Sequence, residues 1–230
     1  NFIAFTKVDE AENNIKESFD LNVLLPSNIL RYMNEKKKIF IHFSTDYVFD
    51  GLKNEEYVET DFKKPLNIYG EHKSKAENII LESATKSIII RTSGVYSKFG
   101  KNFVKTIIKK ITNKEQLNVV NDQISSPTYA KDIIKMLISL LKSKLIENLT
   151  IPKVYHFTNE GECSWYDIAI KISEYLNANA NIYKINSSNL DLPATRPKYS
   201  KLNSNKIKKD LEIIIPEWTD SLKEFIQLDY

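Results

Sequence analysis

The sequence predicts an α/β fold, in which helices cover a parallel β-sheet and a smaller α+β lobe follows toward the C-terminus. Through residues 1–150, short apolar runs typical of strands alternate with longer segments typical of helices. The strand-like runs 39–43 and 88–90 are almost entirely apolar, as parallel strands buried on both faces require. The last third is less regular. We expect it to form a lobe over the carboxyl edge of the sheet, where ligands bind in such folds.

The first half of the chain alternates as this fold requires. Its predicted elements are the end of a buried strand at 1–5 whose beginning is absent, a long helix at 10–35 interrupted at Pro26, a strand at 39–43, a polar loop at 50–65, a helix at 67–83 and a strand at 87–92. In the helix at 67–83, positions 69, 73, 76 and 80 fall on one stripe, so Tyr69 and Lys73 share a face with Ala76 and Ile80.

The second half continues the pattern with shorter elements. They are a helix at 103–112, a strand at 117–120, a helix at 129–145, a strand at 154–158, a helix at 164–176 with Ser164 as its N-cap, a strand at 181–185 and a final helix at 218–228. The segment 189–204 is polar and rich in turn residues. We assign residues 1–150 to the sheet domain, interleaved with segments of the lobe, and residues 151–230 mainly to the lobe.

Composition narrows the class of protein. A net charge of +3 with dispersed basic residues gives no reason to expect a nucleic-acid partner. The single cysteine, Cys163, excludes an internal disulfide and suits a reducing compartment, so we expect a cytoplasmic protein. No apolar run approaches the roughly 20 residues that span a bilayer, and no membrane association is expected. No group of side chains has metal-ligand spacing, and we predict no metal site.

Tyr69 and Lys73 stand one helical turn apart, and Thr45 follows the strand at 39–43. A carbonyl that accepts hydride needs a proton donor. A free tyrosine has a pKa of about 10, and a cation one turn away lowers it. We therefore expect Lys73 to lower the pKa of Tyr69. A hydroxyl such as that of Thr45 can polarise the same oxygen. The set predicts an oxidoreductase, although a Tyr-x-x-x-Lys spacing also arises on helices by coincidence.

The motifs around these residues closely resemble the dTDP-4-dehydrorhamnose reductase family of extended short-chain dehydrogenases/reductases. The matching stretches are Ser44-Thr45-Asp46-Tyr47-Val48-Phe49-Asp50-Gly51, Pro65-Leu66-Asn67-Ile68-Tyr69-Gly70-Glu71-His72-Lys73, residues 1–12, Arg91-Thr92-Ser93-Gly94-Val95-Tyr96, residues 100–103, residues 122–128, residues 155–157, residues 164–166 and Arg196-Pro197-x-x-Ser200. They run in order along almost the whole chain. The resemblance implies a partial Rossmann-like sheet whose first strands are missing, and a smaller α+β substrate lobe.

The resemblance also implies roles for individual residues. Tyr69 would be the proton donor, Lys73 its activator and ribose contact, and Thr45 the hydroxyl partner, while Asn22 would help to order a proton relay. Cofactor contacts would come from Ile3, Ala4, Phe5, Thr6, Ser44, Tyr69 and Lys73. Substrate contacts would come from Val8, Thr45, Asp46, Val48, Gly94 and Arg196. The family reduces the 4-keto group of a dTDP-6-deoxy-hexulose with NADPH or NADH, in nucleotide-sugar and polysaccharide biosynthesis, and the resemblance allows a homodimer.

Two departures from the family pattern leave alternatives open. The Gly-x-x-Gly-x-x-Gly loop and the first strands are absent, which corresponds to roughly 60 residues of a βαβαβ unit. Gly94 stands where the family often has a Trp close to the sugar. The alternatives are a non-catalytic relative, resembling the regulatory beta subunit of methionine adenosyltransferase, and an inactive truncated fragment. An intact Thr45, Tyr69 and Lys73 favours the enzyme.

Several other residues have a structural interpretation beside a functional one. We expect His42, inside an apolar strand, to be a core histidine with satisfied hydrogen bonds. Arg196 either clamps a diphosphate or forms a surface ion pair. Asp46 either binds substrate or caps the following turn. Asp122 and Gln123 are more consistent with orienting the lobe than with contacting a ligand.

Overall fold

A three-stranded parallel sheet forms the centre of the molecule. The computed structural model describes every residue from Asn1 to Tyr230. Its sheet contains β1 (Phe40–Thr45), β2 (Ser87–Thr92) and β7 (Lys153–His156), in the order β1-β2-β7. In register, Phe43 pairs with Ile90, and Ile90 pairs with Tyr155. The predicted parallel sheet of an α/β fold is confirmed.

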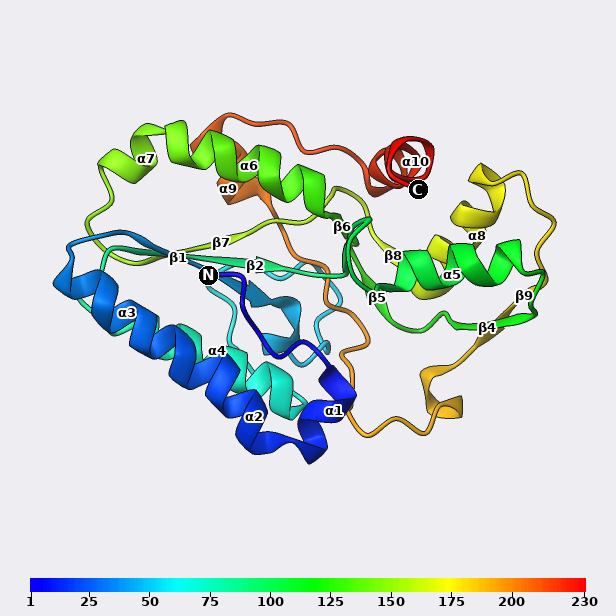
Figure 1. The fold of residues 1–230 in the computed structure, drawn as a ribbon, viewed down its shortest axis with the longest axis horizontal. Helices are drawn as coiled ribbons and strands as arrows, with labels where there is room; N and C mark the ends of the chain where they lie inside the picture. The colour runs from blue at the N-terminus through cyan, green and yellow to red at the C-terminus, as the bar shows by residue number, and fades with distance from the viewer.

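Helices cover both faces of this sheet, as Figure 1 shows. Successive side chains of a strand point to opposite faces. Ile88 and Ile90 of β2 therefore pack in one core, with Met136 of α6 (Ala130–Lys142). Ile89 packs on the other face, in a cluster with Leu30 of α3 (Leu25–Glu35) and with Ile80 of α4 (Ile68–Leu81). Burial on both faces explains why β2 is so apolar at its centre.

The first helical region is more broken than predicted. It consists of α1 (Val8–Asn13), α2 (Ile15–Phe19), the single π-turn η1 (Asp20–Leu24) and α3. The interruption lies at Asn14, whose backbone leaves the helical region, rather than at Pro26. Pro26 stands in the first turn of α3, where a missing backbone N–H is tolerated. The expected break at Pro26 is wrong for this reason.

Residues 1–5 do not form the expected buried strand. The Asn1 amino group donates to the Ile41 carbonyl and the Phe43 N–H donates to the Asn1 carbonyl, so only the first residue pairs with β1. Beyond Asn1 the segment leaves the sheet, and Phe2 and Ile3 are exposed. Phe2 stacks on the ring of Phe43 instead of entering the core.

The other long elements begin and end close to the predicted residues. β2, α5 (Phe103–Thr112), β4 (Leu117–Val120) and α10 (Trp218–Leu228) match in full. α8 (Trp165–Tyr175) begins at a capping box in which Ser164 accepts from the Asp167 N–H. The elements that the sequence did not predict are short: β3 (Val95–Tyr96), β5 (Ile124–Ser125), β6 (Thr128–Tyr129), α7 (Lys144–Glu147), β8 (Cys163–Ser164), α9 (Asn205–Leu211), and the 3₁₀ turns η2 (Asp46–Val48) and η3 (Ser187–Asn189).

A second core lies beside the sheet, at the end where β1 and β2 finish. There β4 pairs in parallel with β9 (Ile182–Ile185), and α5, α8 and α10 pack around it. The chain crosses between the two cores, because β7 and α9 return to the first core after α5 and β4 have joined the second.

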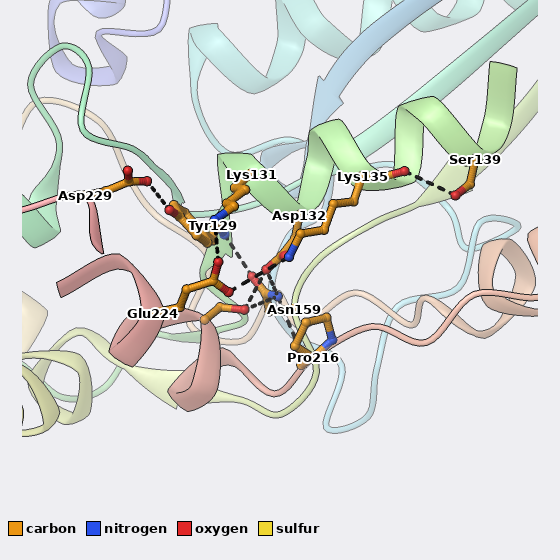
Figure 2. A network of polar contacts seen from close by, with 10 residues as sticks. Tyr129, Lys131, Asp132, Lys135, Ser139, Asn159, Pro216, Glu224 and Asp229 are labelled. Atoms are coloured by element: carbon orange, nitrogen blue, oxygen red, sulfur yellow. Dashed lines mark hydrogen bonds and ion pairs between the residues drawn. The ribbon is translucent and has the colours of Figure 1, made fainter. Parts of the chain in front are cut away.

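A network of polar contacts joins the last helix, α10, to α6, which packs on the sheet (Figure 2). The buried Asp132 carboxylate of α6 accepts from the Ser221 hydroxyl of α10 at 2.6 Å and from the Asn159 amide at 2.9 Å. The Tyr129 hydroxyl donates to the Asp229 carboxylate at the end of α10. α10 thus bonds to α6 while its apolar side packs in the second core. None of the helices is long and apolar enough to cross a membrane.

Candidate active site

A cavity of about 400 Å³ opens where β1 and β2 end. The sheet side contributes Ser44, Thr45, Asp46, Thr92, Ser93 and Gly94 to its wall. The second core and the C-terminal segment contribute Gln123, Ile124, Ser125, Trp165, Pro197 and Ser200. The cavity therefore lies between the two parts of the fold, at the carboxyl edge of the sheet, as open α/β sheets predict.

The start of α4 presents Tyr69 to this cavity. Asn67 is the N-cap, and its side-chain oxygen accepts from the Gly70 N–H at 2.8 Å. The Asn67 amide also donates to the Thr195 carbonyl at 2.8 Å. A side chain at position 70 would place its Cβ 2.2 Å from the Tyr47 carbonyl oxygen, so only glycine allows the helix to approach η2 this closely. The cap and the glycine together fix where Tyr69 points.

Thr45 and Tyr69 meet at the cavity wall. The Thr45 hydroxyl donates to the Asp46 carboxylate, with 3.1 Å between Oγ1 and Oδ1, and accepts from the Tyr47 N–H at 3.2 Å. Thr45 also lies close enough to Tyr69 to favour its phenolate. Tyr69, Thr45 and Asp46 thus face one cavity.

Burial controls the proton affinity of Tyr69. It raises the pKa of Tyr69 to about 12, and the nearby Thr45 hydroxyl opposes the rise only in part. The negative charge of Asp46 adds to the rise. We expected Lys73 to lower the pKa of Tyr69, and this expectation is wrong for the structure as described. The buried phenol keeps its proton at neutral pH and is a proton donor in its resting state.

Lys73 lies one turn further along α4, buried against β1. Its ammonium donates to the Phe43 carbonyl at 2.6 Å and to the His42 ring at 3.1 Å. Burial lowers the pKa of Lys73 to about 8, against the opposing charge of Glu77. His42 is fully buried, as expected of a core histidine.

Asp46 is buried at the base of the same cavity. Its second carboxylate oxygen accepts from the Ser200 hydroxyl at 2.6 Å, which joins η2 to the C-terminal segment. Burial raises the pKa of Asp46 to about 6, while the hydrogen bonds from Ser200 and Thr45 hold it below the value that burial alone would give. Asp46 lines the cavity and is the first residue of η2, but the side chain that caps this turn is that of Thr45, so the capping role considered for Asp46 is wrong.

Four further predicted residues line the cavity: Thr6, Val8, Ser44 and Gly94. The Ser44 hydroxyl is buried without a hydrogen-bond partner. It lies close enough to help to lower the pKa of Glu77, but not in the geometry of a hydrogen bond. Gly94 has a φ of +53° and lies against Pro127, so any side chain at position 94 would strain the backbone.

Other predicted residues lie away from the cavity. Val48 is fully buried in a small core with Phe49 and Tyr57, so its predicted contact with the sugar is wrong. Ile3 is 58% exposed and Phe5 is buried, and neither they nor Ala4 reach the cavity wall.

Asn22 does not point into the cavity as a proton relay would require. It braces Phe5 instead, because its oxygen accepts from the Phe5 N–H and its amide donates to the Phe5 carbonyl, both at 3.0 Å. This pair of bonds fixes the segment that carries Thr6 and Val8, so the effect of Asn22 on the site is indirect.

Arg196 forms an ion pair and also lines a second cavity. Its guanidinium donates to both carboxylate oxygens of Asp9, at 3.1 and 2.5 Å. The second cavity is lined by Asp122, Gln123, Asn186, Ser187, Ser188, Leu190, Leu192, Ala194, Thr195, Arg196 and Lys198. Gln123 belongs to both cavity walls, so they adjoin. Asp122 accepts from the Ser187 N–H at 2.7 Å, consistent with the structural role that we favoured.

Several cavity residues were not predicted from the sequence. They are Tyr47, Thr92, Ser93, Ile124, Ser125, Pro197 and Ser200. Several of them, including Ser200, stand in the quoted motifs, but only the folded chain shows that Ser200 reaches Asp46, which is distant in sequence. No spacing rule predicts such a contact.

Known proteins resemble this chain over nearly its whole length. The family model described as "RmlD substrate binding domain" matches residues 1–230. A dTDP-4-dehydrorhamnose reductase of Aggregatibacter actinomycetemcomitans is 37% identical over 229 residues, covering 97% of this chain and 78% of the relative. The spore coat polysaccharide biosynthesis protein SpsK of Bacillus subtilis is 35% identical over 227 residues, covering 99% and 77%.

Solved structures show the same likeness. The crystal structure of a dTDP-4-dehydrorhamnose reductase from Bacillus anthracis, in complex with NADP, superposes with a TM-score of 0.90 at 35% identity and covers 98% of this chain and 78% of that one. A dTDP-4-dehydrorhamnose reductase ortholog from Clostridium acetobutylicum gives a TM-score of 0.91 at 33% identity, covering 99% and 79%. A UDP-glucuronic acid 4-epimerase from Bacillus cereus, at 20% identity and a TM-score of 0.84, shares the fold.

Proposed function

The chain belongs to the dTDP-4-dehydrorhamnose reductase family, and from this we propose that it is an NAD(P)H-dependent reductase of the 4-keto group of a dTDP-6-deoxy-hexulose. The product would serve nucleotide-sugar and polysaccharide biosynthesis, consistent with the names of the relatives. The observation that carries the proposal is the meeting of Tyr69 and Thr45 at one cavity wall, with Lys73 buried one helical turn further along α4.

The chain's own residues would handle the proton of the reaction. A bound nicotinamide supplies the hydride. The keto oxygen would lie against Tyr69 and Thr45, and Tyr69, protonated at neutral pH, gives its proton to the oxygen as negative charge develops there. The Lys73 ammonium, buried one turn further along α4, would bind the cofactor ribose through its remaining N–H.

The residues present fit a nicotinamide cofactor. The Ser44 hydroxyl is a buried polar atom on the cavity wall with no hydrogen-bond partner in the chain, so it is available to a ligand. The buried Lys73 ammonium can donate three hydrogen bonds and makes two to protein atoms, which leaves one donor for a cofactor ribose. Ser44, Tyr69, Lys73 and Thr6 would therefore hold the cofactor at the end of β1.

The adjoining cavities suit a sugar nucleotide. The first cavity would take the sugar, next to Tyr69. The second brings Arg196 and Lys198 to its wall, where cations can bind a diphosphate. A third cavity, of about 300 Å³, shares Gln123 and Trp165 with the first and is lined mainly by apolar side chains, as a nucleobase requires. A single extended ligand can thus pass from the proton donor to the second core.

The free thiol of Cys163 fits the cytoplasmic location that we propose for this reaction. Cys163 is buried and unpaired. Cytoplasmic proteins keep their thiols reduced.

The test is an assay of NADPH and NADH oxidation with dTDP-4-dehydrorhamnose, using the purified protein and its Tyr69→Phe variant. We expect turnover in the parent, and a loss of about 10²-fold or more in kcat when the phenol proton is removed. Tyr47→Phe is the matched control, since Tyr47 lines the same cavity and its ring lies edge-on to Tyr69.

Two results would contradict the proposal. Unchanged turnover in Tyr69→Phe would remove this residue from the reaction. A folded parent that binds the sugar nucleotide without oxidising either cofactor would instead favour a non-catalytic binding subunit.

A further inference from the structure

Lys73 is a buried cation without a carboxylate partner. Its side chain forms no salt bridge, although the residue is only 2% exposed. The nearest acid along α4, Glu77, is already bonded to the Arg91 guanidinium at 2.7 and 2.9 Å and to the Lys63 ammonium at 3.0 Å. Burying an ammonium without a counter-charge is costly, so neutral groups must hold Lys73 in place.

Two neutral acceptors on β1, the Phe43 carbonyl and the His42 ring, hold the Lys73 ammonium in place. The Phe43 carbonyl accepts from Nζ at 2.6 Å, and the ring of His42 meets Nζ at 3.1 Å through its Nε2. His42 and Phe43 are adjacent in the strand, and Thr45 follows two residues later. The strand that carries the hydroxyl partner of Tyr69 therefore also carries both anchors of Lys73.

The His42 ring is neutral and can only be an acceptor toward Lys73. Burial lowers the pKa of His42 well below its ordinary value, and the charge of Lys73 lowers it further. No carboxylate acts on the ring to oppose this. An ammonium only donates, so Nε2, which faces it, is the acceptor of this contact.

We propose that His42 is a positioning residue of the reductase: through Nε2 it fixes the Lys73 ammonium on β1 and leaves the third N–H for Tyr69 or the cofactor ribose. The inference rests on the proposed function. It gives His42 a task beyond that of a core residue, because a hydrogen bond to the charged form of a lysine favours that form.

The direct test measures the pKa of Lys73 by NMR of isotope-labelled lysine side chains, with Lys73→Met to assign the signal. His42→Leu removes the acceptor at similar volume, and we expect the pKa of Lys73 to fall from about 8 by about one unit. His42→Gln places an amide oxygen close to the position of Nε2, and we expect it to restore most of the shift. Phe40→Leu, two residues earlier in β1 and also buried, controls for loss of packing.

The kinetic readout is the pH profile of kcat/KM. If Lys73 acts as a cation, kcat/KM falls as pH rises through the pKa of Lys73, and His42→Leu moves this decline to lower pH. Displacement of the ammonium should also reduce kcat/KM by about tenfold at neutral pH, with His42→Gln within a few-fold of the parent. Phe40→Leu should leave the profile in place.

An unchanged Lys73 pKa in both His42→Leu and His42→Asn, whose amide is too short to reach Nζ, would overturn the inference whatever the activity. Should His42→Leu not fold, the comparison of His42→Gln with His42→Asn decides the same point. If the proposed function is wrong instead, the parent protein lacks turnover. In that case the pKa of Lys73 still changes when residue 42 is substituted.

Discussion

Burial of the Asp46 carboxyl group at the cavity lowers the stability of the folded protein. Its pKa is about 6 in the folded protein, against an ordinary value of 3.8. The folded state therefore binds more protons than the unfolded state between these values, and its stability falls as pH rises from about 4 to about 6. Well above pH 6 the loss of folding stability from burying the ionised Asp46 side chain has reached its full value. Selection for stability alone would therefore not favour a carboxylate at this position.

We therefore expect Asp46→Asn to stabilise the protein at pH 7.5 by up to about 2 kcal/mol and to have little effect at pH 4. Denaturant unfolding at both pH values measures this. Asp50→Asn is the control of opposite sign. Burial alone would raise the pKa of Asp50, but hydrogen bonds from the Leu52 N–H and Tyr57 and the charge of Lys64 outweigh it and lower the pKa. Asp50→Asn should thus lose stability at pH 7.5, and an Asp46→Asn effect equal at both pH values would refute the argument.

The sequence was most informative about residues whose chemistry depends on local spacing. Tyr69 and Lys73 are one turn apart on any helix, and Thr45 follows a strand that its apolar residues identify, so these three positions could be predicted. The direction of the Tyr69 pKa shift could not, because it depends on burial by distant segments. For the same reason Val48 was wrongly assigned to the sugar, since only the packing against Phe49 and Leu202 shows that it is a core residue.

At the scale of elements, α4 and β2 are joined beneath the site by a buried ion pair. Arg91 of β2 makes two hydrogen bonds to Glu77 of α4, and both residues are almost completely buried. Burial alone would raise the pKa of Glu77, but the hydrogen bonds and charge of Arg91 outweigh it and lower the pKa. The pair fixes the helix that carries Tyr69 against the strand that ends at the cavity.

Removing one member of this pair should be more damaging than removing both. We expect Arg91→Met to destabilise the protein by about 3–5 kcal/mol, because it leaves the Glu77 carboxylate buried with only Lys63 as a cation. Arg91→Met combined with Glu77→Leu should recover much of that loss. Unfolding free energies of the single and double variants, measured in denaturant, make the comparison. Equal losses in the single and double variants would contradict it.

Long elements could be predicted closely, and short ones could not. β2, α5, β4 and α10 each have enough residues to show a period, and their ends match. A two-residue strand such as β5 shows none, and it forms only because β8 lies beside it. The π-turn at 20–24 could not be predicted from the sequence either, since a single extra residue in a helix leaves the apolar pattern almost unchanged.

For the whole molecule, α10 connects the two cores. Phe225 and Leu222 pack in the second core, while the Ser221 hydroxyl donates to the buried Asp132 carboxylate of α6. Asn159, which follows β7, donates to the same carboxylate. One buried acid thus receives hydrogen bonds from α10 and from the segment after β7.

We expect Asp132→Ala to destabilise the protein by about 2–4 kcal/mol, because Ser221 and Asn159 lose a buried charged acceptor. It should also increase hydrogen exchange in α10 more than in β2. Lys135→Ala is the matched control, since Lys135 bonds to the other oxygen of Asp132 but is itself exposed, and we expect less than about 1 kcal/mol. Equal increases in hydrogen exchange in α10 and β2 of Asp132→Ala would show that α10 does not open independently of the sheet.

The two halves of the cavity wall have a practical consequence for redesign. Proton transfer is assigned to β1 and α4, whereas the surfaces toward the rest of the ligand belong to residues 122–125 and 186–200. These stretches could be exchanged with those of a homologue to alter which sugar nucleotide is accepted, while the reaction itself stays the same. Ser200 is the exception that such a graft must retain, because its hydroxyl supports the Asp46 carboxylate.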